Sequence, residues 1–387
     1  MLPSIALSAL ASSSFAFGDP SKASAIPIPL QARSSLPVRK GIVIPEVLAH
    51  RGYWAANKHA VDTNDTRLPR SPTSFKRHSL TLDTGGPNAY IWTGQIEIGT
   101  QPRTQQFNVA IDTNKYDPSK STSKEKLSGT FSGVYYDNTH VTGPIYADTV
   151  IISGLSAERQ VFSPIEQVTA LVNDGSDGIL GLGYNNQLPA GIQSLLDTLY
   201  SQKKIPDRIF SIRLASDSGS ELYIGGINLS KYEGSITYVP LESGTGYYWT
   251  VRGSVLANGE MTFQGQMVID SGTSFIYGRK NFVRDWWSKV PGAAPCRDRE
   301  CGGPGYYMYP CNSPPRLSLK FGEREFPVST EDFKFRETSH NMCVGVVCAH
   351  DDKDPLQDTW IIGNRFMKNV YTIFDVGREQ IGFATPI

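Results

Sequence analysis

The stretch Val268–Ile276 constrains the fold more than any other part of this 387-residue chain. An apolar run ends in Asp270, a turn of small residues follows at Ser271–Ser274, and apolar residues resume at Phe275. A buried strand that delivers one carboxylate into a turn of backbone amides and hydroxyls has this pattern. Such donors hold an ionised acid in a fixed geometry, which serves chemistry more than folding. We therefore expect Asp270 to be a functional carboxylate with a partner elsewhere in the chain.

The candidate partner is Asp112, because a second apolar strand pattern, Gln106–Thr113, also runs into an acid. Each half of the chain then contains a strand with paired apolar residues and a glycine. These are Gly178–Gly183 in the first half and Trp360–Asn364 in the second. This weak internal repeat predicts two related β lobes that face each other across a cleft.

The remaining patterning favours strands. Alternating or apolar runs predict strands at Tyr90–Gly99, Val134–Tyr136, Ile145–Ile152 and Ile209–Ile212. Helical patterns are scarce, and the two best lie at Ile192–Leu199 and Phe282–Lys289. Together with 36 Gly and 25 Pro, this texture predicts a mostly β, turn-rich globular protein.

The charge is distributed unevenly along the chain. The net charge is zero, which gives no support for nucleic-acid binding. Residues 19–77 nevertheless hold ten basic and four acidic side chains, and residues 78–387 have a matching acidic excess. Because the charge changes sign at Lys76-Arg77, we predict that residues 19–77 are a basic pro-segment cleaved near this dibasic pair. The alternative is an ordinary solvated charge pair.

The N-terminus and the cysteines indicate the compartment. Residues 1–18 are uncharged and rich in Ala, Ser and Leu, which predicts a secretory signal peptide; the alternative is a disordered N-terminus. No apolar run is long enough to span a membrane. Five cysteines lie in the last quarter, where an oxidising compartment favours disulfides, and an odd number leaves at least one thiol unpaired within the chain. We predict secretion, with the vacuole as second choice.

Several short motifs in order resemble the pepsin-like aspartic proteases, especially the secreted fungal members. The resemblance covers residues 88–387 and rests on Ile96–Thr100, Ala110–Thr113, Tyr116–Ser121, Asp177–Gly183, Asp270–Thr273 and Trp360–Gly363. It implies a bilobal β fold around a substrate cleft, with an N-terminal lobe at residues 78–235 and a C-terminal lobe at residues 236–387.

The resemblance also implies a reaction. Asp112 and Asp270 would form a catalytic dyad, held by the turn residues Thr113, Ser271, Gly272 and Thr273. Two carboxylates held close together share a proton, so one can act as a base on water while the other polarises the scissile carbonyl. The implied partners are polypeptide substrates and the chain's own pro-segment, acting as an intramolecular inhibitor. The resemblance implies a monomer with no metal and no cofactor.

Other residues take roles by the same resemblance. Tyr135 matches the tyrosine of the flap that closes over substrate, although Tyr136 and Asn138 stand where glycines are expected. Cys311 and Cys343 match a disulfide of the second lobe. Cys296 and Cys301 could close a short loop, while Cys348 competes with Cys343 for a partner. The triplet Asn228-Leu229-Ser230 is a candidate glycosylation site.

The first-lobe motif departs from the family. Only Thr113, Asn114 and Lys115 separate Asp112 from Tyr116, where the family has a glycine, serines and a Trp-bearing strand. The distance from Asp270 to Gly363 is 93 residues, whereas that from Asp112 to Gly181 is 69, a shortfall of 24. A skipped exon or faulty gene model, a pseudo-protease, and a working enzyme with a rebuilt turn all fit, and we favour them in that order.

The loss has a chemical consequence. The missing glycine and serine would help to fix the carboxylates, and Lys115 would place a cation near them, which opposes proton sharing. We predict weak or no peptidase activity for the chain as written. Two hypotheses follow: an acid-acting endopeptidase made as a zymogen, or a non-catalytic protein that binds peptides or inhibitors.

Overall fold

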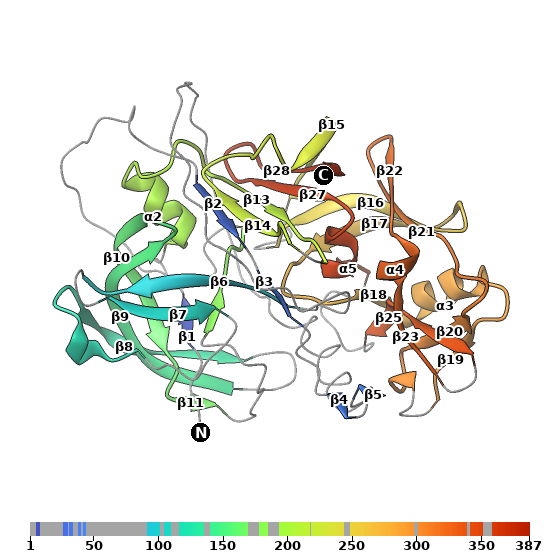
Figure 1. Ribbon diagram of the computed structural model, residues 1–387, viewed down its shortest axis with the longest axis horizontal. Coiled ribbons are helices and arrows are strands. Elements are labelled where there is room, and N and C mark those ends of the chain that lie inside the picture. Colours follow the sequence, from blue (N-terminus) through green and yellow to red (C-terminus); the bar gives the residue numbers. More distant parts are fainter. Residues whose placement is uncertain are drawn as a thin grey trace. The chain divides into compact units, whose positions relative to one another are not determined.

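The computed structural model (Figure 1) describes two compact units, and the fold is mostly β, as predicted. The described residues are 91–100, 104–109, 116–134, 140–168, 178–184, 193–216, 218–243, 248–297, 301–338, 341–350 and 358–387, with the backbone of five short strands between Ile5 and Val43. Unit 1 takes the described residues within 1–35 and 60–229, together with Ile373–Arg378. Unit 2 takes those within 36–59, together with Ser230–Thr372 and Glu379–Ile387.

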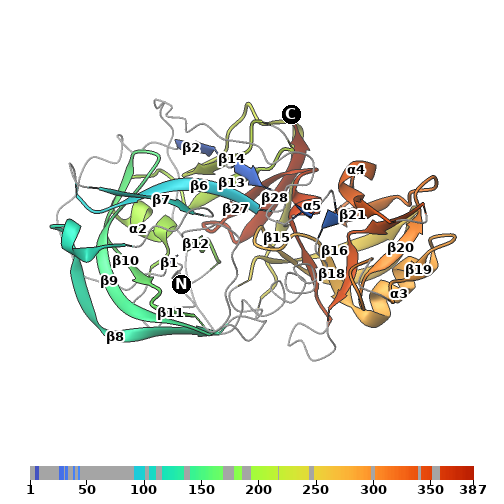
Figure 2. The same cartoon turned by 60° about the horizontal axis from the view of Figure 1, so that its bottom comes forward.

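Unit 1 is built on long curled strands, which Figure 2 shows from a second side. β6 (Ile91–Ile98) pairs with β7 (Gln105–Val109) and with β9 (His140–Ile152). β9 also pairs with β8 (Glu125–Val134), β10 (Leu155–Pro164) and the short β11 (Gln167–Val168). The predicted strands at Tyr90–Gly99 and Ile145–Ile152 are therefore confirmed.

Further elements complete unit 1. A 3-10 turn, η2 (Pro118–Lys120), precedes β8, and β12 (Gly178–Leu180) follows β11. The predicted helix begins at Leu195 and runs to Ser201 as α2, because the Ser194 side chain caps it by accepting from the Asp197 amide. β13 (Ile209–Arg213) pairs with β14 (Glu221–Ile224), and β27 (Tyr371–Asp375) lies next to β13. Phe374 stacks on Phe210 with ring centroids 4.6 Å apart, so a segment near the C-terminus completes this unit.

The five N-terminal strands are β1 (Ile5–Leu7), β2 (Ile26–Pro29), β3 (Gln31–Arg33), β4 (Val38–Arg39) and β5 (Ile42–Val43). β1 lies between β10 and β12, β2 adds to the edge of β14, and β3 pairs with β6. β4 pairs only with β5 within the described strands.

A buried carboxylate organises the segment that follows the first-lobe motif. The Asp148 side chain accepts from the Tyr116 hydroxyl at 2.6 Å, from the hydroxyls of Ser121 and Ser123, and from the Thr149 amide at 2.8 Å. Burial and this hydrogen bond to Asp148 raise the pKa of Tyr116, so the phenol stays protonated and serves as a donor. The motif Tyr116–Ser121 thus has a structural role in unit 1.

Unit 2 contains a mixed sheet in the order β22, β21, β16, β17, β26, β18, β25. Their bounds are β16 (Thr250–Ala257), β17 (Glu260–Ile269), β18 (Ile276–Arg279), β21 (Leu317–Phe321), β22 (Arg324–Pro327), β25 (Val347–His350) and β26 (Trp360–Ile362). A two-residue turn of Asn258 and Gly259, both at positive φ (52° and 88°), joins β16 to β17. This turn matches the twist of antiparallel strands.

Three helices and a four-stranded sheet accompany this sheet among the described residues of unit 2 (Figure 1). The second predicted helix is α3 (Lys280–Ser288), which buries Val283, Trp286 and Trp287. Two one-turn helices, α4 (Thr330–Phe333) and α5 (Asn364–Met367), follow β22 and β26. A smaller sheet has the order β19 (Ala294–Pro295), β20 (Tyr307–Pro310), β24 (Met342–Gly345), β23 (Lys334–Glu337), and β15 (Tyr232–Pro240) pairs with β28 (Gln380–Pro386).

Two disulfides are formed in unit 2, and both predicted pairs are confirmed: Cys296–Cys301 and Cys311–Cys343. Cys311 directly follows β20, and Cys343 lies on the neighbouring β24. Cys348 is the remaining thiol and is buried in β25. Across the described parts of the chain, every helix is too short and too polar to cross a bilayer.

The buried Cys348 thiol leads to a testable prediction. Burial raises the pKa of this thiol well above its usual range, so the reactive thiolate is suppressed in the folded chain. We expect a thiol reagent to label almost no cysteine in the folded, non-reduced protein from about pH 7 to 9, and one per chain after unfolding. Quantitative mass spectrometry measures both values, with Cys348→Ser as the unlabelled control. Rapid labelling of the folded chain would contradict the prediction.

The candidate glycosylation site also has a structural role. The Asn228 side-chain amide donates to both carboxylate oxygens of Glu221, at 2.8 and 3.0 Å, and Glu221 is only 7% exposed. A glycan replaces one of these two amide hydrogens, so modification would cost a buried carboxylate one of its donors. We expect the folded protein from a eukaryotic secretory host to carry unmodified Asn228, as measured by peptide mass. Ser230→Ala, which removes the triplet but keeps the Asn228 amide, supplies the peptide mass of the unmodified reference.

Candidate active site

Asp270 lies at the end of β17, in the middle of the unit 2 sheet. The Ile269 amide donates to the Trp249 carbonyl and the Asp270 amide to the Ile362 carbonyl, both at 3.0 Å. β17 and β26 run parallel, with Ile269 opposite Ile362. The buried apolar strand therefore ends at the acid, as the sequence pattern predicted, and Asp270 is 8% exposed.

The turn after Asp270 supplies donors to its carboxylate. The Gly272 amide donates to Oδ1 at 2.9 Å, and the Thr273 hydroxyl donates to Oδ2 at 2.6 Å. The Thr273 amide closes the turn by donating to the Asp270 carbonyl at 3.2 Å. Each carboxylate oxygen thus has its own donor, which fixes the plane of the group. Thr273 is buried, whereas Ser271 and Gly272 are exposed.

Gly363 brings the second strand against this turn. β26 lies between β17 and β18, parallel to the first and antiparallel to the second. A Cβ at Gly363 would lie 2.3 Å from the Phe275 carbonyl oxygen and 2.4 Å from that of Thr273. Only glycine allows such an approach, and the Gly363 amide donates to Phe275 at 3.0 Å. The predicted glycine strand therefore passes close to the acid in unit 2.

Unit 1 presents only part of the corresponding arrangement. Asp112, Thr113 and Tyr135 lie outside the described residues, so their roles stay predictions. The residues on either side of the dyad position are tied together: the Gln105 side chain donates to the Asp117 carbonyl at 2.9 Å and accepts from the Asp117 amide at 2.8 Å. Between Val109 and Tyr116 only residues 110–115 remain to form the first active-site turn.

The glycine of the unit 1 repeat has different surroundings from Gly363. Among the described residues, a Cβ at Gly181 would meet no heavy atom within 4 Å, and Gly181 is exposed. On β26, residues Ile361 and Ile362 pair with β18, the strand that follows the Asp270 turn. On β12, the described pairing is with β1, which runs parallel to it. The described part of unit 1 therefore lacks the close contact that Gly363 makes in unit 2.

Asn364 was included in the predicted repeat without an assigned role, and Arg365 was missed from the sequence. Asn364 is 2% exposed, and its amide donates to the Thr273 carbonyl at 2.8 Å; the Arg365 amide donates to Ser274 at 3.2 Å. The start of α5 thus holds the turn that presents Asp270. The polar pair Asn364-Arg365, which follows the apolar strand Trp360–Ile362 and Gly363, was the sequence signal that could have identified them.

The comparisons with known proteins agree with this geometry. The family described as eukaryotic aspartyl protease matches residues 72–386. An aspartic protease of Phaffia rhodozyma is 35% identical over 334 residues, covering 80% of this chain and 79% of the relative. Secreted aspartyl protease 1 of Malassezia globosa is 28% identical, covering 76% and 73%. The crystal structure of an aspartic proteinase from Irpex lacteus superposes with a TM-score of 0.66 at 19% identity, over 77% of this chain and 94% of that one. The chain belongs to the eukaryotic aspartyl protease family.

Proposed function

We propose that this chain derives from a secreted aspartic endopeptidase, made as a zymogen and active at acidic pH, and that the chain as written turns over peptides weakly or not at all. The Asp270 turn is the observation that supports an endopeptidase origin. Its carboxylate has one donor on each oxygen and lies at the end of a buried strand. Such preorganisation is what a carboxylate needs to activate water or polarise a carbonyl.

In the intact reaction, Asp270 would work with Asp112. One ionised carboxylate removes a proton from water, the other donates a hydrogen bond to the scissile carbonyl, and a tetrahedral intermediate forms without an acyl-enzyme. The titration belongs to the pair, so base and acid are not assigned individually. Both carboxylates must be held within a fraction of an ångström of their working positions.

The proposed impairment rests on the asymmetry between the repeats. Gly363 is packed against the turn of Asp270, whereas no atom of the described residues lies within 4 Å of a Cβ at Gly181. Gln105 and Asp117 are hydrogen-bonded to each other, which leaves residues 110–115 to hold Asp112. A missing Gly-Ser turn and strand after Thr113 account for both observations. This also favours the alternative function, in which the protein binds peptides or inhibitors without turnover.

The zymogen proposal is supported by the basic segment at residues 19–77. Its strands β2 and β3 pair with β14 and β6, so the backbone of this segment adds to sheets of unit 1. A basic segment bound to an acidic body loses its ion pairs when acid protonates the carboxylates, which favours release at low pH.

A direct assay tests the proposal. The full chain and its Asp270→Asn variant are incubated with an unfolded polypeptide between about pH 3 and pH 7, and new N-termini are counted, including any near Lys76-Arg77. We expect the two proteins to differ little. Strong turnover that depends on Asp270 would overturn the proposed impairment. Sequencing the transcript across the codons of Thr113 and Asn114 shows separately whether a Gly-Ser-bearing insert exists, which would restore the ordinary enzyme.

A further inference from the structure

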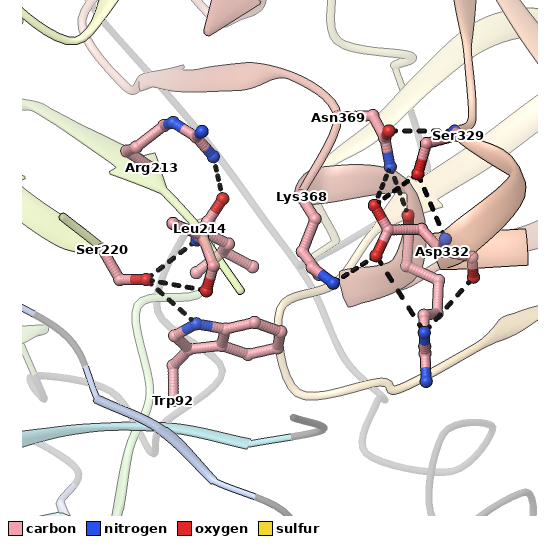
Figure 3. Close-up of polar contacts among 10 residues, drawn as sticks. Trp92, Arg213, Leu214, Ser220, Ser329, Asp332, Lys368 and Asn369 are labelled. Atoms are coloured by element: carbon pink, nitrogen blue, oxygen red, sulfur yellow. Dashed lines mark hydrogen bonds and ion pairs between the residues drawn. The ribbon is translucent and has the colours of Figure 1, made fainter. Parts of the chain in front are cut away.

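A buried ionic cluster lies beside the Asp270 turn in unit 2, between α4 and α5 (Figure 3). We call it the Asp332 cluster; its members are Ser329, Asp332, Arg365, Lys368 and Asn369. The side chains of Arg365 and Lys368 are only 1% and 2% exposed, and that of Asp332 is 11% exposed. Buried charges need partners, so these residues are expected to be strongly coupled.

The members converge on one carboxylate. Lys368 Nζ forms an ion pair with Asp332 Oδ1, and Arg365 approaches the same oxygen at 4.0 Å. The Ser329 hydroxyl donates to Oδ2 at 2.9 Å, and the Asn369 amide donates to it at 3.0 Å. Figure 3 shows Lys368, Ser329 and Asn369 directed at Asp332 from different sides.

Arg365 connects the cluster to the candidate active site. Its guanidinium donates to the Asp332 carbonyl at 3.4 Å, while its backbone amide donates to Ser274 at 3.2 Å. One residue earlier, the Asn364 amide holds the Thr273 carbonyl, and Thr273 donates its hydroxyl to Asp270. Asp332 is therefore connected to the Asp270 carboxylate through Arg365, Asn364 and Thr273. Each step is a hydrogen bond except that from Arg365 to Asn364, which are adjacent in the chain.

The helix that carries this path cannot hold itself in place. α5 has four residues, which is too short for a helix to be stable without tertiary contacts, and Gly363 gives it no side-chain cap. Arg365 lies within α5, and Lys368 caps its C-terminus. The charges on α5 and its C-cap thus fix the helix to α4 through Asp332.

We propose that Asp332 is a positioning residue for Asp270: its carboxylate anchors α5, and the first amides of α5 hold the turn that orients the acid. The proposal deepens the proposed function, on which it rests, by naming a group that sets the geometry of its carboxylate. Asp332 takes no part in bond making.

Hydrogen exchange followed by mass spectrometry on the full chain tests the proposal. Asp332→Asn keeps the size of the side chain and removes its charge. We expect peptides covering residues 270–276 and 363–368 to exchange at least about 10-fold faster, with little change in the rest of unit 2. Val283→Ala, a cavity variant in α3, is the matched control and should show no such selectivity. Equal acceleration throughout unit 2, or none at the turn, would overturn the proposal.

A second variant and a second readout cover the case in which Asp332→Asn does not fold. Lys368→Met leaves Arg365 beside Asp332 and should give the same exchange pattern at smaller amplitude. The ¹³Cγ resonance of Asp270, assigned by its loss in Asp270→Asn, should shift in either Asp332-cluster variant and stay in place in Val283→Ala. Neither readout requires peptide cleavage. A chain that shows the expected exchange pattern but cleaves no peptide therefore supports the positioning role of Asp332, and only the proposed catalysis is contradicted.

Discussion

Insertion of a Gly-Ser-bearing segment between Thr113 and Asn114 is expected to raise peptide cleavage at acidic pH by at least about 100-fold. Misplacing a catalytic group by about 1 Å can cost that much, and residues 110–115 leave little chain to hold Asp112. The inserted segment carries the glycine, serines and Trp-bearing strand that the family resemblance places after Thr113. Steady-state cleavage of an unfolded polypeptide, compared with the parent chain, gives the ratio.

Two controls make this result specific. Asp270→Asn in the extended chain should return cleavage to the level of the parent, because each dyad member is needed. A chain that carries a scrambled segment of the same length should have a normally folded unit 2 and remain inactive. An extended chain that folds but stays inactive would contradict the account of the defect and would favour a protein whose role is binding.

Replacement of the two repeat glycines by alanine is expected to have very different effects in the two units. In unit 2, a methyl group at Gly363 would overlap two carbonyl oxygens of the Asp270 turn, at 2.3 and 2.4 Å. Backbone atoms cannot rotate away, so we expect Gly363→Ala to lower the free energy of unfolding by about 3 kcal/mol. In unit 1, a methyl group at Gly181 would contact none of the described residues, so Gly181→Ala should change stability by no more than about 0.5 kcal/mol.

Chemical denaturation with a probe for each unit measures the contrast. Among the described residues, unit 1 holds Trp92 and unit 2 holds Trp249, Trp286, Trp287 and Trp360. Single-tryptophan reporters can be made for each unit once Trp54 is also replaced. In the extended chain described above, Gly181→Ala should become costly, because the restored strand would pack against it. Equal and large losses for both glycines in the parent chain would show that unit 1 already has the close contact.

Local patterns explain what could be predicted from the sequence. The strand ending in Asp270 and its small-residue turn are contiguous, so alternation and turn chemistry identify them directly. The start of α2 was predicted too early because apolar spacing continues upstream, whereas the structure begins the helix at the Ser194 cap. The Cys311–Cys343 disulfide followed from a family likeness and Cys296–Cys301 from its short spacing, since five cysteines by themselves leave the pairing open.

Long-range contacts explain what was missed. Asp332 lies in α4 and Lys368, 36 residues later, caps α5; both helices are too short to show an amphipathic period. Nothing local marks either residue as part of the same cluster. Asn228 and Glu221 are only seven residues apart, yet the sequence pattern did not reveal the hydrogen bonds that join the candidate glycosylation site to a buried acid. The Asp112 side of the dyad lies outside the described residues and stays a prediction.

The return of the chain to unit 1 at Ile373–Arg378 has a consequence for protein synthesis. Phe374 stacks on Phe210, and the Val376 amide donates to the Arg208 carbonyl at 3.0 Å. These contacts form only after almost the whole polypeptide has left the ribosome, although domains commonly fold in order from the N-terminus during translation. Unit 1 must therefore wait, incompletely closed, while the residues of unit 2 are made. A stop codon shortly before Ile373 would damage the half of the protein that was translated first.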